Sequence, residues 1–349
     1  MGSTTVQFTD PSGLSQGSPS DAATADESWQ AVLANAITEV GELCRLLDLP
    51  PRLAQVSSRA GGFPLLVPRP FLSRLRRGDP LDPLLLQVLP QELEEAEHPR
   101  FSCDPLGEAR STAPAGGLQK YQGRLLMVTV GQCGVHCRFC FRRHFPYTKG
   151  PPRLPRWAQV LQAVQRDLSL REVILSGGDP LTLDDDELAW LVERIAGIEH
   201  VKRLRVHTRM PIVIPQRVTE GLIRVLRSTR LVPLMVVHVN HPAEIDSAVG
   251  GALATLVDHG IPLLSQSVLL RGVNDSADVL CALFERLVEL RVMPYYLHQL
   301  DPVAGAAHFE VPEDRGRALM AEVRCRLPGY AVPRYVRETP GAPCKEILA

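Results

Sequence analysis

The stretch that decides the fold is Leu125-Leu-Met-Val-Thr-Val130-Gly-Gln-Cys133-Gly-Val-His-Cys137-Arg-Phe-Cys140. Its first six residues form an apolar, partly β-branched run that predicts a buried strand. Three cysteines then fall within eight residues, directly after the expected end of this strand. Reactive residues behind a strand are typical of α/β folds, which carry function in the loops at the carboxyl ends of their strands.

Similar apolar runs follow at a regular pitch, with starts separated by 47, 30, 30, 30 and 30 residues. Strand and helix patterns that alternate in this way predict βαβ units and a parallel sheet. Six units favour an incomplete (β/α)6 barrel; an open doubly wound sheet is the alternative that periodicity leaves open. The expected strands are 125–130, 172–175, 202–207, 232–238, 262–268 and 292–297, and the expected helices are 157–168, 184–196, 216–228, 243–259 and 276–290.

The rest of the chain divides by composition. Residues 1–27 are rich in Ser, Thr, Gly and Asp and predict a flexible tail. Residues 28–120 have helical apolar spacing interrupted by prolines, which predicts a mainly helical N-terminal region. The barrel is expected over 121–300, followed by a C-terminal segment over 301–349.

Charge and hydropathy exclude several classes of protein. The 349 residues include 38 Lys+Arg and 39 Asp+Glu, so the net charge of −1 predicts no basic surface for nucleic acid or membrane. No apolar run approaches the ~18 residues of a membrane helix. The first thirty residues contain no Lys or Arg, so no secretory signal is expected. We expect a soluble, cytoplasmic protein.

The cysteine cluster predicts a metal centre. Of eight cysteines, three crowd together and five are scattered, unlike a disulfide framework. Soft thiolate ligands favour an iron–sulfur cluster or zinc. On a four-iron cluster, three cysteines leave one iron free to bind substrate or cofactor. The alternative is a Cys3His zinc site with His136 or His144 as the fourth ligand.

Three other segments are candidates for binding. Ser176-Gly177-Gly178-Asp179-Pro180 ends the second strand, and its bare glycines would let the main chain approach a ligand closely. Arg142 follows the last cysteine by two residues, where its fork could grip a carboxylate.

The third candidate segment involves lysine, which occurs only four times in the chain. Lys345 lies in a Gly/Pro turn and suits a Schiff base to pyridoxal 5′-phosphate. Lys120, Tyr121 and Arg124 enter the first strand with two cations and a phenol, which suit a phosphate.

Together these motifs resemble the lysine 2,3-aminomutase family of radical S-adenosylmethionine (SAM) enzymes, and within it the (R)-β-lysine isomerases that serve bacterial elongation factor P. The likeness covers about residues 45–345 and is carried by CRFCFRRHFPY, SGGDPL, PIVIPQR, QSVLLRGVND, MPYYLHQLD and GAAHF.

The resemblance implies residue roles. Three cysteines would ligate a [4Fe–4S] cluster, whose open iron binds SAM, and a lysine would hold pyridoxal phosphate. The cluster ligands would be Cys133, Cys137 and Cys140, and the pyridoxal lysine would be Lys345. SAM would be bound by Ser176, Gly177, Gly178, Asp179 and Gln266, and the phosphate or ring of pyridoxal by Lys120, Tyr121 and Arg124. Arg142 would bind the substrate carboxylate, and Asp275 with Glu338 would bind the distant substrate ammonium.

The resemblance also implies a reaction and partners. The expected reaction converts L-lysine to (R)-β-lysine with electrons from a donor such as flavodoxin or ferredoxin, and its product would reach elongation factor P through a separate ligase. Alternatives are an aminomutase for another amino acid or with a catabolic or osmolyte role, and a non-catalytic iron–sulfur or zinc protein.

Overall fold

The computed structural model describes residues 27–57, 62–108, 116–147 and 152–349. The expected tail therefore lies almost entirely outside the described residues. Within them one sheet contains β1 (Gly117–Tyr121), β2 (Arg124–Val130), β3 (Glu172–Gly177), β4 (Arg203–Thr208), β5 (Val232–His238), β6 (Leu263–Val268), β7 (Val292–His298), β8 (Arg334–Arg337) and β9 (Glu346–Ile347).

The sheet confirms the predicted incomplete barrel. The six strands from β2 to β7 are parallel and correspond to the six expected runs. Their spatial order follows the chain order from β1 to β9 without reversal. A doubly wound sheet needs a reversal of strand order, so this alternative is wrong.

Three short strands extend the expected six. β1 pairs antiparallel with β2 through a tight connection in which Gly123 has φ +77°, so the end of the region expected to be helical is a hairpin. β8 lies parallel to β7, and β9 lies antiparallel to β8. This last pair places the turn that carries Lys345 beside the barrel.

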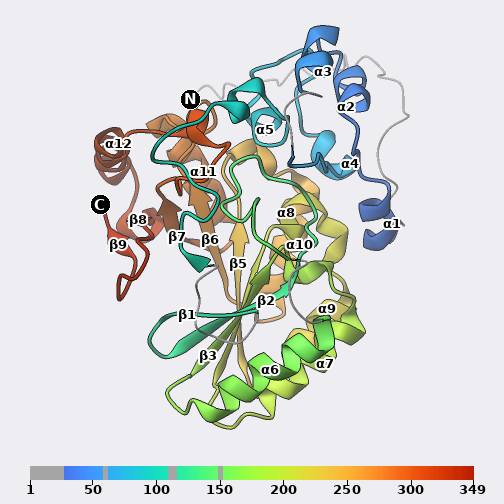
Figure 1. Cartoon of the computed structure of the whole chain (residues 1–349), viewed down its shortest axis with the longest axis vertical. Helices are drawn as coiled ribbons and strands as arrows, with labels where there is room; N and C mark the ends of the chain where they lie inside the picture. The colour runs from blue at the N-terminus through green and yellow to red at the C-terminus, as the bar shows by residue number, and fades with distance from the viewer. Residues whose placement is uncertain (1–26, 58–61, 109–115, 148–151) are drawn as a thin grey trace, which may run out of the picture.

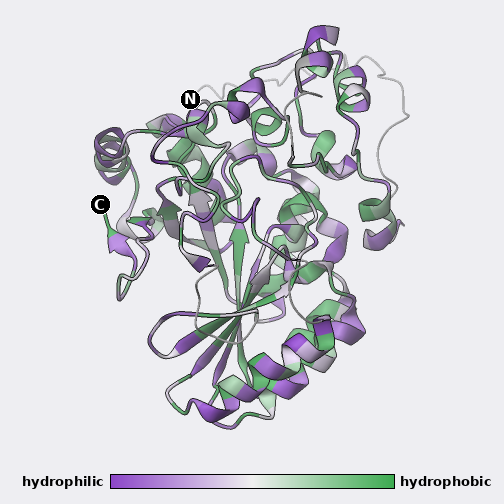
Figure 2. Ribbon diagram, viewed as in Figure 1, coloured by the Kyte–Doolittle hydropathy of each residue, from purple (hydrophilic) through white to green (hydrophobic). Residues whose placement is uncertain are grey.

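Helices surround the strands (Figure 1). A representative one, α7 (Asp185–Ala196), is capped at its N-terminus by Asp184, whose side chain accepts a hydrogen bond from the main-chain N–H of Glu187. Its buried face follows helical spacing: Leu188, Leu191, Val192 and Ile195. Figure 2 shows the same division, with hydrophobic central strands and hydrophilic residues on the outer helices. The helices of this layer are α6 (Arg153–Arg166), α7 (Asp185–Ala196), α8 (Met210–Val213), α9 (Glu220–Arg227), α10 (Ser247–Asp258), α11 (Ala277–Glu289) and α12 (Glu313–Arg326).

The N-terminal region is a set of short helices at the end of the barrel toward which β5 points in Figure 1. Prolines start or interrupt these pieces, in agreement with the expected breaks. They are α1 (Trp29–Ala34), α2 (Val40–Leu46), α3 (Pro51–Ser57), α4 (Arg69–Leu72), α5 (Pro83–Leu86) and the 3-10 turn η1 (Glu92–Glu95). Among the described residues, no helix has the length and apolar character needed to cross a bilayer.

Candidate active site

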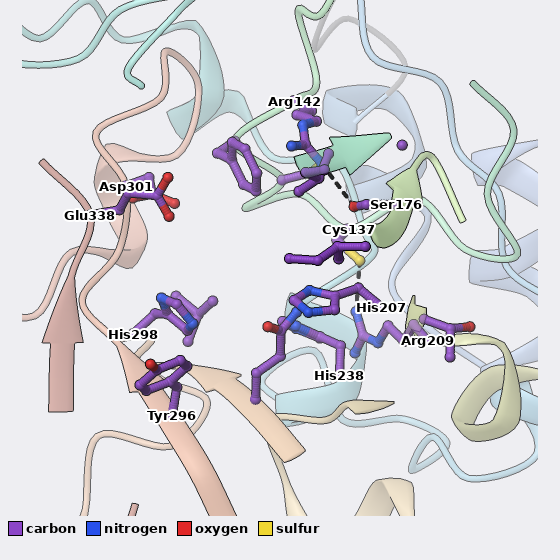
Figure 3. Close-up of a pocket in the computed structure, with 18 of the residues that line it drawn as sticks. Cys137, Arg142, Ser176, His207, Arg209, His238, Tyr296, His298, Asp301 and Glu338 are labelled. Carbon is purple, nitrogen blue, oxygen red and sulfur yellow. Dashed lines mark hydrogen bonds between the residues drawn. The ribbon is translucent and has the colours of Figure 1, made fainter. Parts of the chain in front are cut away.

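A cavity of about 440 Å³ opens inside the barrel and is lined by residues of the N-terminal region, of the cysteine-containing segment and of all nine strands; Figure 3 shows part of this lining. Fourteen of the fifteen residues predicted for the site line it. They are Lys120, Tyr121, Arg124, Cys133, Cys137, Cys140, Arg142, Ser176, Gly177, Gly178, Asp179, Gln266, Glu338 and Lys345.

The cysteine loop (residues 133–140) follows β2 and is held by the N-terminal region. The main-chain N–H of His136 donates to the carbonyl of Leu66 at 3.0 Å, and that of Arg138 to the carbonyl of Gln87 at 2.8 Å. These bonds fix the loop from outside the barrel while its thiols face the cavity.

A buried ion cluster reinforces this attachment. Glu94 accepts hydrogen bonds from Arg138 at 2.8 and 2.5 Å and from Arg143 at 2.6 Å. The ring of Phe63 lies 5.0 Å from each guanidinium. One carboxylate from η1 thus binds two arginines that lie within and just after the cysteine loop.

The three thiols suit a cluster better than they suit zinc. Burial raises the pKa of all three, and that of Cys140 to about 11, so a site that takes them as thiolates must supply positive charge. His136 and His144 instead direct ring nitrogens at the carbonyls of Pro64 and Ala304. The described residues assemble no group of three or more His, Cys, Asp or Glu side chains that could hold one metal ion. Three thiols from one loop at one cavity still fit a four-iron cluster, which takes one thiolate per iron.

The glycine turn after β3 packs directly on the start of the cysteine loop. A Cβ atom on Gly177, whose φ is +131°, would lie 2.5 Å from the carbonyl oxygen of Val130. A Cβ on Gly178 would lie 2.2 Å from the carbonyl oxygen of Gln132. Both are backbone atoms, so glycine is required here for the two loops to touch.

Asp179 links this turn to the end of β4. Its carboxylate accepts from the Thr208 hydroxyl at 2.7 Å and from the main-chain N–H of Arg209 at 2.6 Å. The Arg209 side chain then donates to the sulfur of Cys137 at 2.7 Å and to Glu244 at 2.9 Å. Arg209, which is not among the predicted site residues, therefore contacts a predicted cluster ligand (Figure 3).

An alternating chain of charges crosses the cavity wall. Glu108 binds the Arg142 guanidinium through both oxygens, at 2.7 and 2.8 Å, and the Lys120 ammonium at 2.6 Å. Lys120 also contacts Glu338 at 2.6 Å, and the other Glu338 oxygen binds Lys345. Lys120 was predicted to surround a phosphate, but the structure commits its ammonium to two carboxylates. Glu108 lies in the region expected to be mainly helical and is not among the predicted site residues.

Tyr121 and Arg124 fit an anion. Arg124 stacks over the Tyr121 ring at 4.7 Å, and the buried Tyr121 hydroxyl has no hydrogen-bond partner. Within the described ranges Arg124 forms no ion pair. A guanidinium beside an unsatisfied phenol suits the phosphate of pyridoxal phosphate, and Lys120 lines the same cavity.

The structure does not bring Asp275 to the cavity. Its carboxylate accepts from the main-chain N–H of Gly272 at 3.1 Å and closes the turn after β6. Asp301, which follows β7, lines the cavity and lies next to Glu338 in Figure 3. Burial and the charge of Glu338 raise the pKa of Asp301 to about 7. Burial alone would raise the pKa of Glu338, but the Lys345 and Lys120 ammonium groups lower it to about 2.

Three histidines also line the cavity: His207 on β4, His238 on β5 and His298 on β7. Burial lowers the pKa of His207 well below its ordinary value and those of His238 and His298 to about 3. They are therefore neutral imidazoles at pH 7. None of the three is among the residues predicted for the site.

Comparisons with known proteins agree with this geometry. The Radical SAM superfamily model matches residues 127–281, which include the cysteine loop and the glycine turn. The chain is 46% identical over 324 residues to an L-lysine 2,3-aminomutase of Escherichia coli, covering 92% of this chain and 94% of that protein.

Two further relatives carry the same name. One from Haemophilus influenzae is 42% identical, with 93% of this chain and 96% of that protein covered. One from Clostridium subterminale is 34% identical, with 92% of this chain and 77% of that protein covered. The chain belongs to the L-lysine 2,3-aminomutase family of radical SAM proteins.

Proposed function

We propose that this protein is an isomerase that converts L-lysine to (R)-β-lysine. The amino group leaves Cα and bonds to Cβ, while a hydrogen moves from Cβ to Cα, so no atom or electron is gained or lost. A four-iron cluster with SAM, held by the three cysteines, would supply a carbon radical for hydrogen transfer, and pyridoxal phosphate on Lys345 would supply a conjugated ring that delocalises the unpaired electron.

The charge arrangement of the cavity carries this proposal. Both oxygens of Glu338 bind lysine ammonium groups, from Lys120 and Lys345, so the carboxylate is placed to hold an alkylammonium. Asp301 lies beside it, and its pKa of about 7 indicates a carboxylic acid that ionises when a cation arrives. A pocket end with two carboxylates selects a cationic side chain over an acidic one.

The opposite charge is offered by Arg142. Its guanidinium lies on the cavity wall two residues after Cys140 and therefore near the predicted cluster. A substrate whose carboxylate binds Arg142 and whose side-chain ammonium binds Glu338 and Asp301 would be held at both ends. This fixes its Cα and Cβ relative to the cysteine loop, and such positioning is the protein's main contribution to the rate.

Lys345 and the phosphate pair orient the second cofactor. The Lys345 ammonium lies against Glu338 and 5.9 Å from the Tyr296 ring, at the edge of the cavity. Glu338 stays ionised beside Lys345 and holds the side chain in place, because its pKa is lowered to about 2. Tyr121 and Arg124 would hold the phosphate, so the cofactor would be tethered at two points.

We also propose the cellular setting that the resemblance implies. The product would be transferred to elongation factor P by a separate ligase, in a cytoplasmic protein reduced by flavodoxin or ferredoxin. The alignments cover 94% of the Escherichia coli protein and 96% of the Haemophilus influenzae protein, which supports an architecture shared with those relatives. The mass of elongation factor P in cells with and without this chain tests the link.

The reaction itself is tested by anaerobic reconstitution with iron, sulfide and pyridoxal phosphate, followed by SAM, a reductant and one amino acid. We expect β-lysine from L-lysine and no β-amino acid from glutamate, ornithine or arginine. A loaded protein that forms 5′-deoxyadenosine but no β-lysine would overturn the assignment of substrate. A loaded protein that forms neither would overturn the assignment of activity.

A further inference from the structure

We propose that Glu108 is a positioning residue that sets the orientation of Arg142 toward the substrate carboxylate. The inference rests on the proposed function, because it assumes that Arg142 binds that carboxylate. Glu108 precedes the barrel in the sequence and belongs to none of the motifs that carry the family resemblance.

The hydrogen bonds of Arg142 show what Glu108 leaves available. A guanidinium has five N–H donors. Glu108 accepts from Nε at 2.7 Å and from Nη2 at 2.8 Å, and the Ser176 hydroxyl accepts from Nη1 at 3.1 Å. Three donors are used, so 5 − 3 = 2 remain, one on Nη1 and one on Nη2. These two donors are left for a ligand carboxylate in the cavity that Arg142 lines.

Glu108 acts from behind the cavity wall. Arg142 and Lys120 both line the cavity, whereas Glu108 is not among its lining residues, and only 2% of its side chain is exposed. A carboxylate in this place does not compete with substrate. It holds the guanidinium plane through a two-point contact, whose geometry allows little rotation.

The same carboxylate separates two cations. Arg142 and Lys120 both bind Glu108, so its negative charge offsets their mutual repulsion. Burial alone would raise the pKa of Glu108, but these two cations bring it below the ordinary value, which keeps the group ionised at neutral pH. The main-chain N–H of Glu108 donates to Asp104 at 2.8 Å, which fixes the backbone that presents the side chain.

Glutamine in place of Glu108 removes both effects. The amide has one acceptor and one donor in place of two acceptors, so one of the two Arg142 bonds becomes a donor facing a donor. Arg142 is then free to rotate about the remaining contacts with Ser176 and with the Phe141 ring, which lies 4.7 Å away. A ligand without a carboxylate should not detect this change.

Equilibrium binding to the reconstituted protein, without reductant or SAM, tests the proposal. L-Lysine is compared with 1,5-diaminopentane, which keeps both amino groups and lacks the carboxylate, and the pyridoxal absorbance reports binding. In Glu108→Gln we expect L-lysine to bind about ten- to a hundredfold more weakly, from the loss of charged hydrogen bonds. Diaminopentane should bind within about twofold of the unchanged protein.

Two variants serve as controls. Glu310→Gln makes the same change in a two-point pair with Arg100, at 2.8 and 2.7 Å, on residues that do not line the cavity, and should change neither affinity. Glu108→Asp keeps the charge and should recover part of the lysine affinity; it also replaces Glu108→Gln if that variant does not fold.

The outcomes separate the two proposals. Equal weakening of both ligands in the Glu108 variants would mean a structural role and overturn the inference, as would unchanged lysine binding. Arg142→Lys shows whether the positioning role of Glu108 or the carboxylate site itself is wrong. If Arg142→Lys weakens the binding of L-lysine but not of diaminopentane, while the Glu108 variants do not, only the positioning role is wrong. If Arg142→Lys also leaves the binding of L-lysine unchanged, the carboxylate site of the proposed function is wrong as well.

Discussion

The ion cluster beneath the cysteine loop gives a prediction that does not depend on catalysis. Glu94, Arg138 and Arg143 have side-chain exposures of 4%, 0% and 3%. Removing one partner of a buried pair leaves an uncompensated charge and costs about 3–5 kcal/mol. Glu94→Gln keeps one acceptor for two arginines, so we expect the free energy of unfolding to fall by about 3 kcal/mol, at the lower end of that range.

Urea unfolding of the purified protein measures this loss, and Glu310→Gln is the matched control. Its pair with Arg100 is a two-point contact on the surface, where 63% of the Arg100 side chain is exposed. We expect the control to lose about 0–1 kcal/mol. Because the cluster holds the loop that carries the cysteines, Glu94→Gln should also bind less iron per chain after reconstitution.

The pH dependence has a defined sign. Burial opposes ionisation of Glu94, but Arg138 and Arg143 bring its pKa below the ordinary value, which is about 4.3. The stabilisation is therefore present above about pH 4 and is lost as the pH falls through the lowered pKa. The gap between wild type and Glu94→Gln should narrow in acid. A Glu94→Gln protein whose free energy of unfolding lies within about 1 kcal/mol of that of wild type, and which binds the same amount of iron per chain, would refute the role of this ion cluster.

Three further outcomes are expected. Gly178→Ala places a Cβ 2.2 Å from a backbone oxygen and should lower iron and sulfide content, whereas Gly251→Ala, with nothing within 4 Å, should leave both unchanged; equal loading of the two variants would contradict the contact between the loops. L-Lysine should bind more tightly as the pH rises through about 7, because Asp301 must ionise to hold the ammonium, and Asp301→Asn should bind weakly without this dependence; a pH-dependent step that persists in the variant would assign it to another group. Asp275→Asn should change lysine affinity by less than about twofold, since its carboxylate closes a turn outside the cavity; a larger loss would restore the original assignment.

The barrel strands could be read from the sequence because their apolar residues recur at a regular pitch between segments of helical pattern. Observed starts at 124, 172, 203, 232, 263 and 292 lie within one residue of those expected. β1 and β9 were missed because they are short edge strands without such a run. A Gln122-Gly123 turn was the available signal for β1, because a glycine with positive φ between two strands is typical of a hairpin.

The site was readable where side chains belong to short motifs and unreadable where partners are distant in sequence. Asp275 and Asp301 both follow strand ends, and only the path of each loop decides which one reaches Glu338. Glu108 contacts Arg142 across 34 residues, and Lys120 contacts Glu338 across 218. No local pattern encodes such pairings, so the ion chain required the structure.

The central claim is that one cavity holds an iron–sulfur cluster on the cysteine loop and pyridoxal phosphate on Lys345. Absorption and electron paramagnetic resonance spectra of anaerobically reconstituted wild type, Cys137→Ala and Lys345→Ala test it most directly. We expect Cys137→Ala to lose the cluster signal and keep the pyridoxal band, and Lys345→Ala to show the reverse. A Lys345→Ala protein that retains covalently bound pyridoxal phosphate, or a Cys137→Ala protein with a normal cluster signal, would contradict the account.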